Sequence, residues 1–125
     1  MSDRRSICLY TPSTDPSGMG AHMVDLVAEY ARTADVALMM RPTVGGRRLL
    51  DRAAALGART VELPSPRDPR FARVVTGFLG TSPADVFHCH VGTGCEDWDG
   101  VRLARRAGCG AVSYTHLTLP TNREV

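Results

Sequence analysis

The sequence ICLY at residues 7–10 is followed by the polar segment TPSTDPS at residues 11–17 and then by Gly18-Met19-Gly20. The apolar run predicts a buried strand, and residues 21–31 after the glycines predict an amphipathic helix. A strand, a glycine turn and a helix in this order leave the first backbone N–H groups of the helix without acceptors inside the helix, and a phosphate group fits there. The opening of the chain therefore predicts a crevice that faces a phosphate group.

Two common phosphate-binding motifs do not fit this opening. The dinucleotide fingerprint has three glycines directly after the strand, whereas Met23 takes the third position here and the loop before Gly18 is long. A Walker loop has lysine and then serine or threonine after its last glycine, whereas Ala21 and His22 follow Gly20. These departures argue against nicotinamide and nucleoside-triphosphate binding. They also leave open a plainer interpretation, in which the glycines only turn the chain.

Apolar runs and helical patterns alternate along the rest of the chain. Further strands are predicted at residues 35–40, 60–63 and 85–90, and further helices at residues 47–56, 71–80 and 96–107. Such alternation forms right-handed crossover units, which place parallel strands in one sheet with helices on both faces. We therefore predict an α/β fold with a Rossmann-like parallel sheet. Ligands bind beyond the carboxyl ends of the strands in such sheets, so the candidate rim is residues 11–20, 41–46 and 90–94.

The length and composition of the chain limit its size class and the partners that we expect. The chain has 125 residues, of which 43% are hydrophobic, and a net charge of +2. This length suits one domain with its own core.

The arginines are spread along the sequence, so nucleic acid is not an expected partner. The apolar run near the N-terminus is too short for a signal peptide or a membrane span, so we expect a cytoplasmic protein and leave membrane association open.

Three of the cysteines are predicted to be reduced, buried thiols. Cys8 and Cys89 fall in predicted strands and Cys109 follows a predicted helix, which is typical of an intracellular protein without a disulfide framework. The sequence HCH at residues 88–90, with Cys95 nearby, has the residue types of a metal site. Adjacent residues of a strand point to opposite faces, however, so Cys89 cannot join both histidines. We therefore predict no metal.

Three segments together resemble the amino-terminal domain of GT-B glycosyltransferases of the family 4 type. PSGMGAHM at residues 16–23 resembles the first glycine loop and helix of that family, and DVFHCH at residues 85–90 resembles its D-V-[VI]-H-x-H strand. VRLARRAG at residues 101–108 matches the helix before the family's fifth strand. These segments occur in the family's order, and the resemblance covers residues 7–110.

The resemblance implies a retaining transfer of a sugar from a nucleotide-sugar donor to an acceptor hydroxyl, without a metal or another cofactor. The reaction would take place in a cleft between this acceptor-side domain and a second, carboxyl-terminal domain that binds most of the donor. In the family, backbone amides of the first glycine loop lie close to the donor diphosphate, a role that carries over to Gly18 and Gly20.

His90 is the candidate catalytic residue. It stands at the predicted carboxyl end of its strand, where an imidazole can donate a hydrogen bond to a sugar hydroxyl or a phosphate oxygen. A histidine that only braces a loop is the alternative. His88 shares its face of the strand but lies deeper, so we expect a hydrogen-bonded core residue there. His22 faces either the cleft or solvent.

Basic residues after the second predicted strand suit an acidic or phosphorylated acceptor and a solvated surface equally well. They are Arg41, Arg47 and Arg48.

The end of the chain has a separate origin in our interpretation. Residues 112–121, VSYTHLTLPT, are the in-frame translation of GTCTCTTATACACATCTGACGCTGCCGACG, a transposase-type sequencing-library adapter. The adapter's next base and a short index account for residues 122–124, and GTG TAG accounts for Val125 and a stop codon. We therefore expect residues 1–110 to be the natural domain and residues 111–125 to be a foreign tail.

Two consequences follow from this origin of the tail. The natural protein would continue into the second domain, and the fragment alone would have no transferase activity. The segment from Ser113 to His116 would occupy the place of the family's T-x-H by coincidence. The β-branched and aromatic residues of the tail nevertheless permit strand pairing.

Two other classes of protein are left open by these observations. One is a stand-alone flavodoxin-like or other phosphate-binding module. A receiver domain is a poor match, because Asp15 alone does not supply its cluster of aspartates. The other class is a GT-B sugar-nucleotide epimerase, which only the second domain would separate from a transferase.

Overall fold

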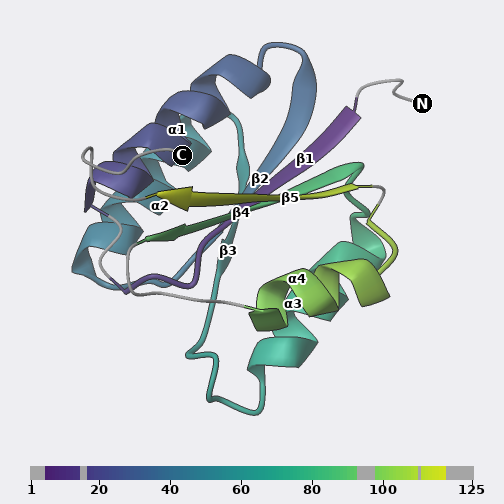
Figure 1. The fold of residues 1–125 in the computed structure, drawn as a ribbon. Helices are drawn as coiled ribbons and strands as arrows, with labels where there is room; N and C mark the ends of the chain where they lie inside the picture. The colour runs from purple at the N-terminus through teal and green to yellow at the C-terminus, as the bar shows by residue number, and fades with distance from the viewer. Residues whose placement is uncertain (1–4, 15–16, 93–97, 110, 118–125) are drawn as a thin grey trace, which may run out of the picture.

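The computed structural model, which describes residues 5–14, 17–92, 98–109 and 111–117, contains one five-stranded sheet (Figure 1). All neighbouring strands pair in parallel, in the order β3-β2-β1-β4-β5. The strands are β1 (Arg5–Tyr10), β2 (Ala34–Met40), β3 (Arg59–Glu62), β4 (Val86–Gly92) and β5 (Ala111–Leu117). This confirms the predicted Rossmann-like α/β fold.

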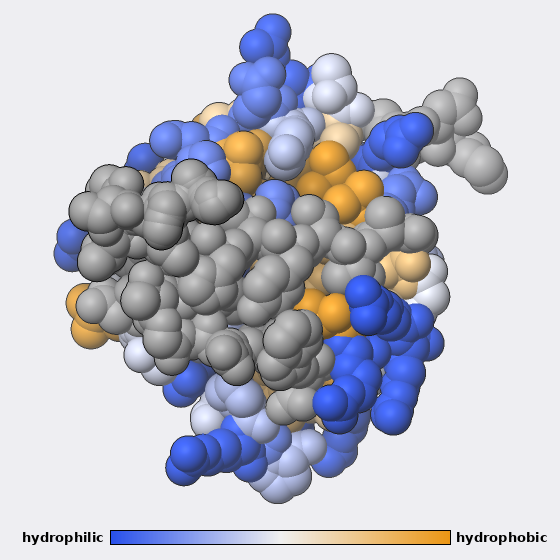
Figure 2. Space-filling model, in the orientation of Figure 1, coloured by the Kyte–Doolittle hydropathy of each residue, from blue (hydrophilic) through white to orange (hydrophobic). Residues whose placement is uncertain are grey.

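Helices cover both faces of the sheet. They are α1 (Ser17–Tyr30), α2 (Val44–Ala55), α3 (Phe71–Thr81) and α4 (Trp98–Arg106). Leu9 and Leu38 belong to a buried cluster with α1 and α2, whereas their neighbours in sequence belong to a second cluster with α3 and α4. The alternation of side chains along each strand therefore divides the buried residues into two cores, one on each face of the sheet. On the outside, hydrophilic side chains cover much of the described surface around α3 and α4 (Figure 2).

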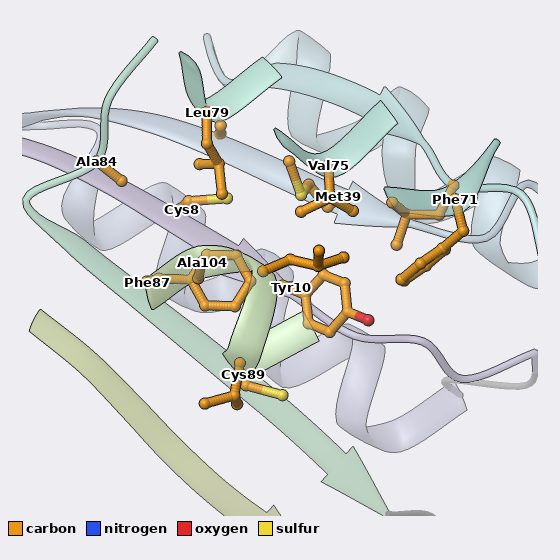
Figure 3. Close-up of a cluster of buried hydrophobic side chains, with 14 residues drawn as sticks. Cys8, Tyr10, Met39, Phe71, Val75, Leu79, Ala84, Phe87, Cys89 and Ala104 are labelled. Carbon is orange, nitrogen blue, oxygen red and sulfur yellow. The ribbon is translucent and has the colours of Figure 1, made fainter. Parts of the chain in front are cut away.

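The core beneath α3 and α4 is built around two aromatic rings (Figure 3). The rings of Tyr10 on β1 and Phe87 on β4 lie 5.2 Å apart, and both residues are fully buried. Cys8 and Cys89 pack in the same cluster as free thiols, and burial raises the pKa of Cys8 well above its usual range. These two cysteines confirm the prediction of buried thiols. Cys109 is a free thiol that is only half-buried, and Cys95 lies outside the described residues.

Two helices begin earlier than their apolar patterns predict. The first was expected after Gly20, yet α1 begins at Ser17 and includes both glycines. The second was expected from Arg47, yet α2 begins at Val44 because the Thr43 hydroxyl oxygen accepts a hydrogen bond from the Gly46 N–H at 3.1 Å. Capping bonds and helical glycines set these boundaries, and neither contributes to the periodicity of apolar residues.

Gly57 ends α2 as predicted. It has a φ of 100°, a conformation that favours glycine, and its N–H donates to the carbonyl oxygen of Ala54 at 3.0 Å. The next N–H, of Ala58, donates to Ala53 at 3.1 Å. The chain is thereby redirected into β3.

The segment interpreted as an adapter-encoded tail supplies β5. Its residues pair with β4 in a parallel register from Val86 opposite Ala111 to Gly92 opposite Leu117. A segment of high β propensity can extend an open sheet edge without having been selected to do so. The pairing is therefore compatible with a foreign tail, and the origin of the tail stays a prediction.

No helix in the described part of the chain is both long and apolar enough to cross a membrane.

Candidate functional site

The strand order creates a switch point between β1 and β4. The chain leaves β1 through α1 toward β2 and β3, and later returns to pair β4 with the other side of β1. Connections that leave neighbouring strands in opposite directions open a crevice beyond the carboxyl ends of those strands, which is where ligands bind in such folds. His90 lies on β4 near this edge, and the N-terminus of α1 follows β1. The fold thus places His90 and the N-terminus of α1 at the same edge of the sheet.

His90 is a buried polar residue at this edge of the sheet. Its side chain is 1% exposed, and its Nε2 atom has no hydrogen-bond partner among the described residues. A buried polar atom without a partner costs about 1–3 kcal/mol relative to a satisfied one. A ligand that supplies the missing hydrogen bond would recover this cost, so His90 is a candidate contact for a polar group.

Two further histidines surround His90. The His88 ring lies with its centroid 4.0 Å from that of His90, and the His22 ring lies 6.3 Å away in an edge-on orientation. His88 was expected to be a core residue, but it is only half-buried. His22 is exposed and lies beside His90, which answers the question that the sequence left open.

Burial keeps the central imidazole neutral. It lowers the pKa of His90 to about 3, with smaller contributions from the nearby His88 and His22. Burial also lowers the pKa of His88, and His22 adds to the effect. A neutral imidazole has one N–H donor and one acceptor nitrogen. His90 is therefore suited to hydrogen bonding with a hydroxyl or a phosphate oxygen, and not to neutralising a charge.

The N-terminus of α1 supplies the positive end of a helix dipole next to these histidines. Its first turn contains no acidic residue. Gly18 is the second residue of the helix and is exposed, so its N–H is among those that the helix leaves without an acceptor. Gly20 is the fourth residue and is buried, at the position where regular helical bonding begins. Of the two predicted glycines, Gly18 is therefore better placed to contact an anion.

His22 was not assigned to the site from the sequence, although its spacing from Gly18 pointed to it. Gly18 and His22 are four residues apart, and residues at this spacing lie on the same face of a helix. If Gly18 faces the crevice, His22 does so too.

Basic residues lie on the neighbouring part of the rim, at the start of α2. Arg47 forms an ion pair with Glu62 at 2.9 Å in which both side chains are 54% exposed. Such a pair contributes about 0–1 kcal/mol, so Arg47 can exchange Glu62 for an anionic ligand. Arg41 is half-buried and Arg48 is exposed. This arrangement fits an acidic acceptor and a solvated surface alike.

The predicted separation of Cys89 from the histidines is confirmed. Cys89 packs with Phe87 in the core beneath α3 and α4, whereas His88 and His90 occupy the alternate positions of β4 and lie next to His22 of α1. The three residues of the HCH sequence therefore do not converge on one point.

Comparisons with protein-family models, with curated protein sequences and with solved structures found no match to this chain.

Proposed function

We propose that this chain is the acceptor-side domain of a cytoplasmic, retaining GT-B glycosyltransferase, which transfers a sugar from a nucleotide-sugar donor to an acceptor hydroxyl. The observation that supports this most directly is the buried, neutral His90, whose unpartnered Nε2 lies at the switch point near the first turns of α1. The resemblance of residues 16–23, 85–90 and 101–108 to the family 4 type supports the same assignment.

The two features of the site have complementary roles in this reaction. Negative charge builds on the diphosphate as it leaves the sugar, and the free N–H groups and dipole at the start of α1 would stabilise that charge. His90 would donate a hydrogen bond to a sugar hydroxyl or a phosphate oxygen, which orients the donor without adding a charge. Closure of the second domain would align the acceptor hydroxyl with the anomeric carbon.

The experiment that tests this proposal begins with the source DNA. Resequencing across the codon for Gly110 is expected to show a reading frame that continues into a second Rossmann-like unit. The complete protein, incubated with a panel of nucleotide sugars and acceptors, is expected to form a glycoside with the anomeric configuration of the donor, as measured by NMR. The 125-residue chain alone is expected to be inactive.

Two results would contradict the proposal. Source DNA that encodes residues 112–125 and then stops would remove the second domain, and a stand-alone binding module would become the better assignment. A complete protein that interconverts nucleotide sugars without using an acceptor would instead be an epimerase of the same fold.

A further inference from the structure

A second polar groove lies on the opposite face of the sheet from the histidines. It runs between α4 and residues 66–72, which lead into α3 and form its first turn. Arg67 contributes from the segment before α3, and Arg102 and Arg106 contribute from α4. Phe71 and Leu103, which are 3% and 9% exposed, form an apolar floor between them. The groove thus combines three cationic side chains with a small apolar surface.

Arg67 and Arg106 bring positive charge to this groove that no described acidic side chain pairs with. Asp68 also lines the groove, but its carboxylate is occupied by Arg70: Oδ1 accepts from the Arg70 backbone N–H at 2.8 Å and Oδ2 accepts from Nη2 at 2.8 Å. These hydrogen bonds lower the pKa of Asp68 to about 2. Neither Arg67 nor Arg106 forms an ion pair within the described ranges. The groove therefore keeps a net positive charge.

Two of these arginines lie close together on α4. Arg102 and Arg106 are four residues apart and share one face of the helix, an arrangement of like charges that destabilises an isolated helix by about 0.2–0.5 kcal/mol. Figure 2 shows strongly hydrophilic side chains gathered over this part of the molecule, next to an apolar patch. An anionic ligand on Arg106 would weaken any repulsion between like charges at this spacing.

We propose that this groove binds a small organic phosphate, with the guanidinium groups of Arg67 and Arg106 on its phosphate oxygens. Guanidinium groups match phosphate oxygens with paired N–H donors, and an arginine on each wall can hold phosphate groups from two sides. The non-phosphate part of the ligand lies against the apolar floor. The site is separate from the proposed transferase site, because His88 and His90 lie on the α1 side of the sheet.

Calorimetric titration of the 125-residue chain with inorganic pyrophosphate at an ionic strength of about 0.15 M, where the Debye length is about 8 Å, tests the proposal. Arg106→Gln and Arg67→Gln are each expected to weaken pyrophosphate binding about tenfold, the loss typical of one charge-assisted hydrogen-bonding group. Arg105→Gln is the matched control, since it removes the same charge from the same helix at a residue that does not line the groove. It is expected to change affinity less than about twofold, because exposed charges are strongly screened.

Three outcomes would overturn the proposal. Equal weakening by Arg105→Gln and Arg106→Gln would show attraction to the general charge of α4. Loss of binding in His90→Gln but not in Arg106→Gln would place the pyrophosphate at the histidine site. Absence of pyrophosphate binding, together with adhesion to phosphatidylglycerol vesicles, would identify a membrane-facing surface. Circular dichroism of each variant verifies that it is folded.

Discussion

The rings of His88 and His90 lie 4.0 Å apart on one face of β4, next to the exposed ring of His22. Burial disfavours the protonated form of both strand histidines, and positive charge on a neighbouring histidine would disfavour it further. The pair is therefore held neutral, and this neutrality has consequences for stability and for the proposed function.

Stability is expected to fall on acidification below pH 6.5. The pKa of His90 is lowered to about 3 in the folded chain, so between pH 6.5 and pH 3 the unfolded chain binds more protons than the folded one. Acid then favours unfolding, and the cost from His90 between pH 7 and pH 5 is about 2 kcal/mol. Urea denaturation at these pH values is expected to show a smaller loss for His90→Gln than for the unmodified chain. His22→Gln, at an exposed histidine, serves as the control. Equal losses of stability in the unmodified chain, His90→Gln and His22→Gln would contradict this prediction.

Under the proposed function, His90→Ala in the complete protein is expected to lower kcat/KM about 10- to 100-fold. It removes a hydrogen bond to the donor and leaves the partner oxygen unpaired, a loss of about 1.5–3 kcal/mol where that oxygen is charged. His90→Gln keeps an N–H donor and is expected to recover part of the activity. Kinetic assays with a saturating acceptor measure the effect, and His88→Gln is the comparison on the same strand. A fully active His90→Ala enzyme would assign His90 to a structural role only.

Phe87→Ala is expected to destabilise the chain by about 3–5 kcal/mol, because it removes a fully buried ring that packs against Tyr10. Phe78→Ala provides a matched comparison. Phe78 is only half-buried, with the Arg59 guanidinium carbon 5.3 Å from its ring centroid, and a smaller loss is expected. Urea denaturation measures both values. A larger loss at Phe78 would mean that the core is not centred on β1 and β4.

Two glycine substitutions are expected to have opposite signs. Gly57→Ala forces a side chain into a backbone conformation with φ of 100° and is expected to cost about 1–2 kcal/mol. Gly77→Ala lies inside α3, where an added Cβ meets no atom within 4 Å, and is expected to stabilise the chain by about 0.5–1 kcal/mol. Thermal unfolding followed by circular dichroism measures both shifts, and two changes of the same sign would refute the assigned end of α2.

The sequence by itself determined the order and type of the elements from β1 to α4. Parallel strands are covered on both faces, so each appears as a short apolar run such as residues 7–10, and each helix carries a periodic apolar face. The position of Gly57 at a helix end was also readable, because a left-handed backbone conformation favours one residue type. These signals are local, and they sufficed for the α/β fold.

Which distant side chains meet depends on the packing of the elements. His22 lies beside His90, and Arg67 shares a groove with Arg106, although each pair is far apart in the sequence. The arginines appear dispersed along the chain, and the packing of α4 against the start of α3 gathers some of them. Local propensity and periodicity fix the elements, whereas the crossover of the chain at the β1–β4 switch point fixes the distances between them.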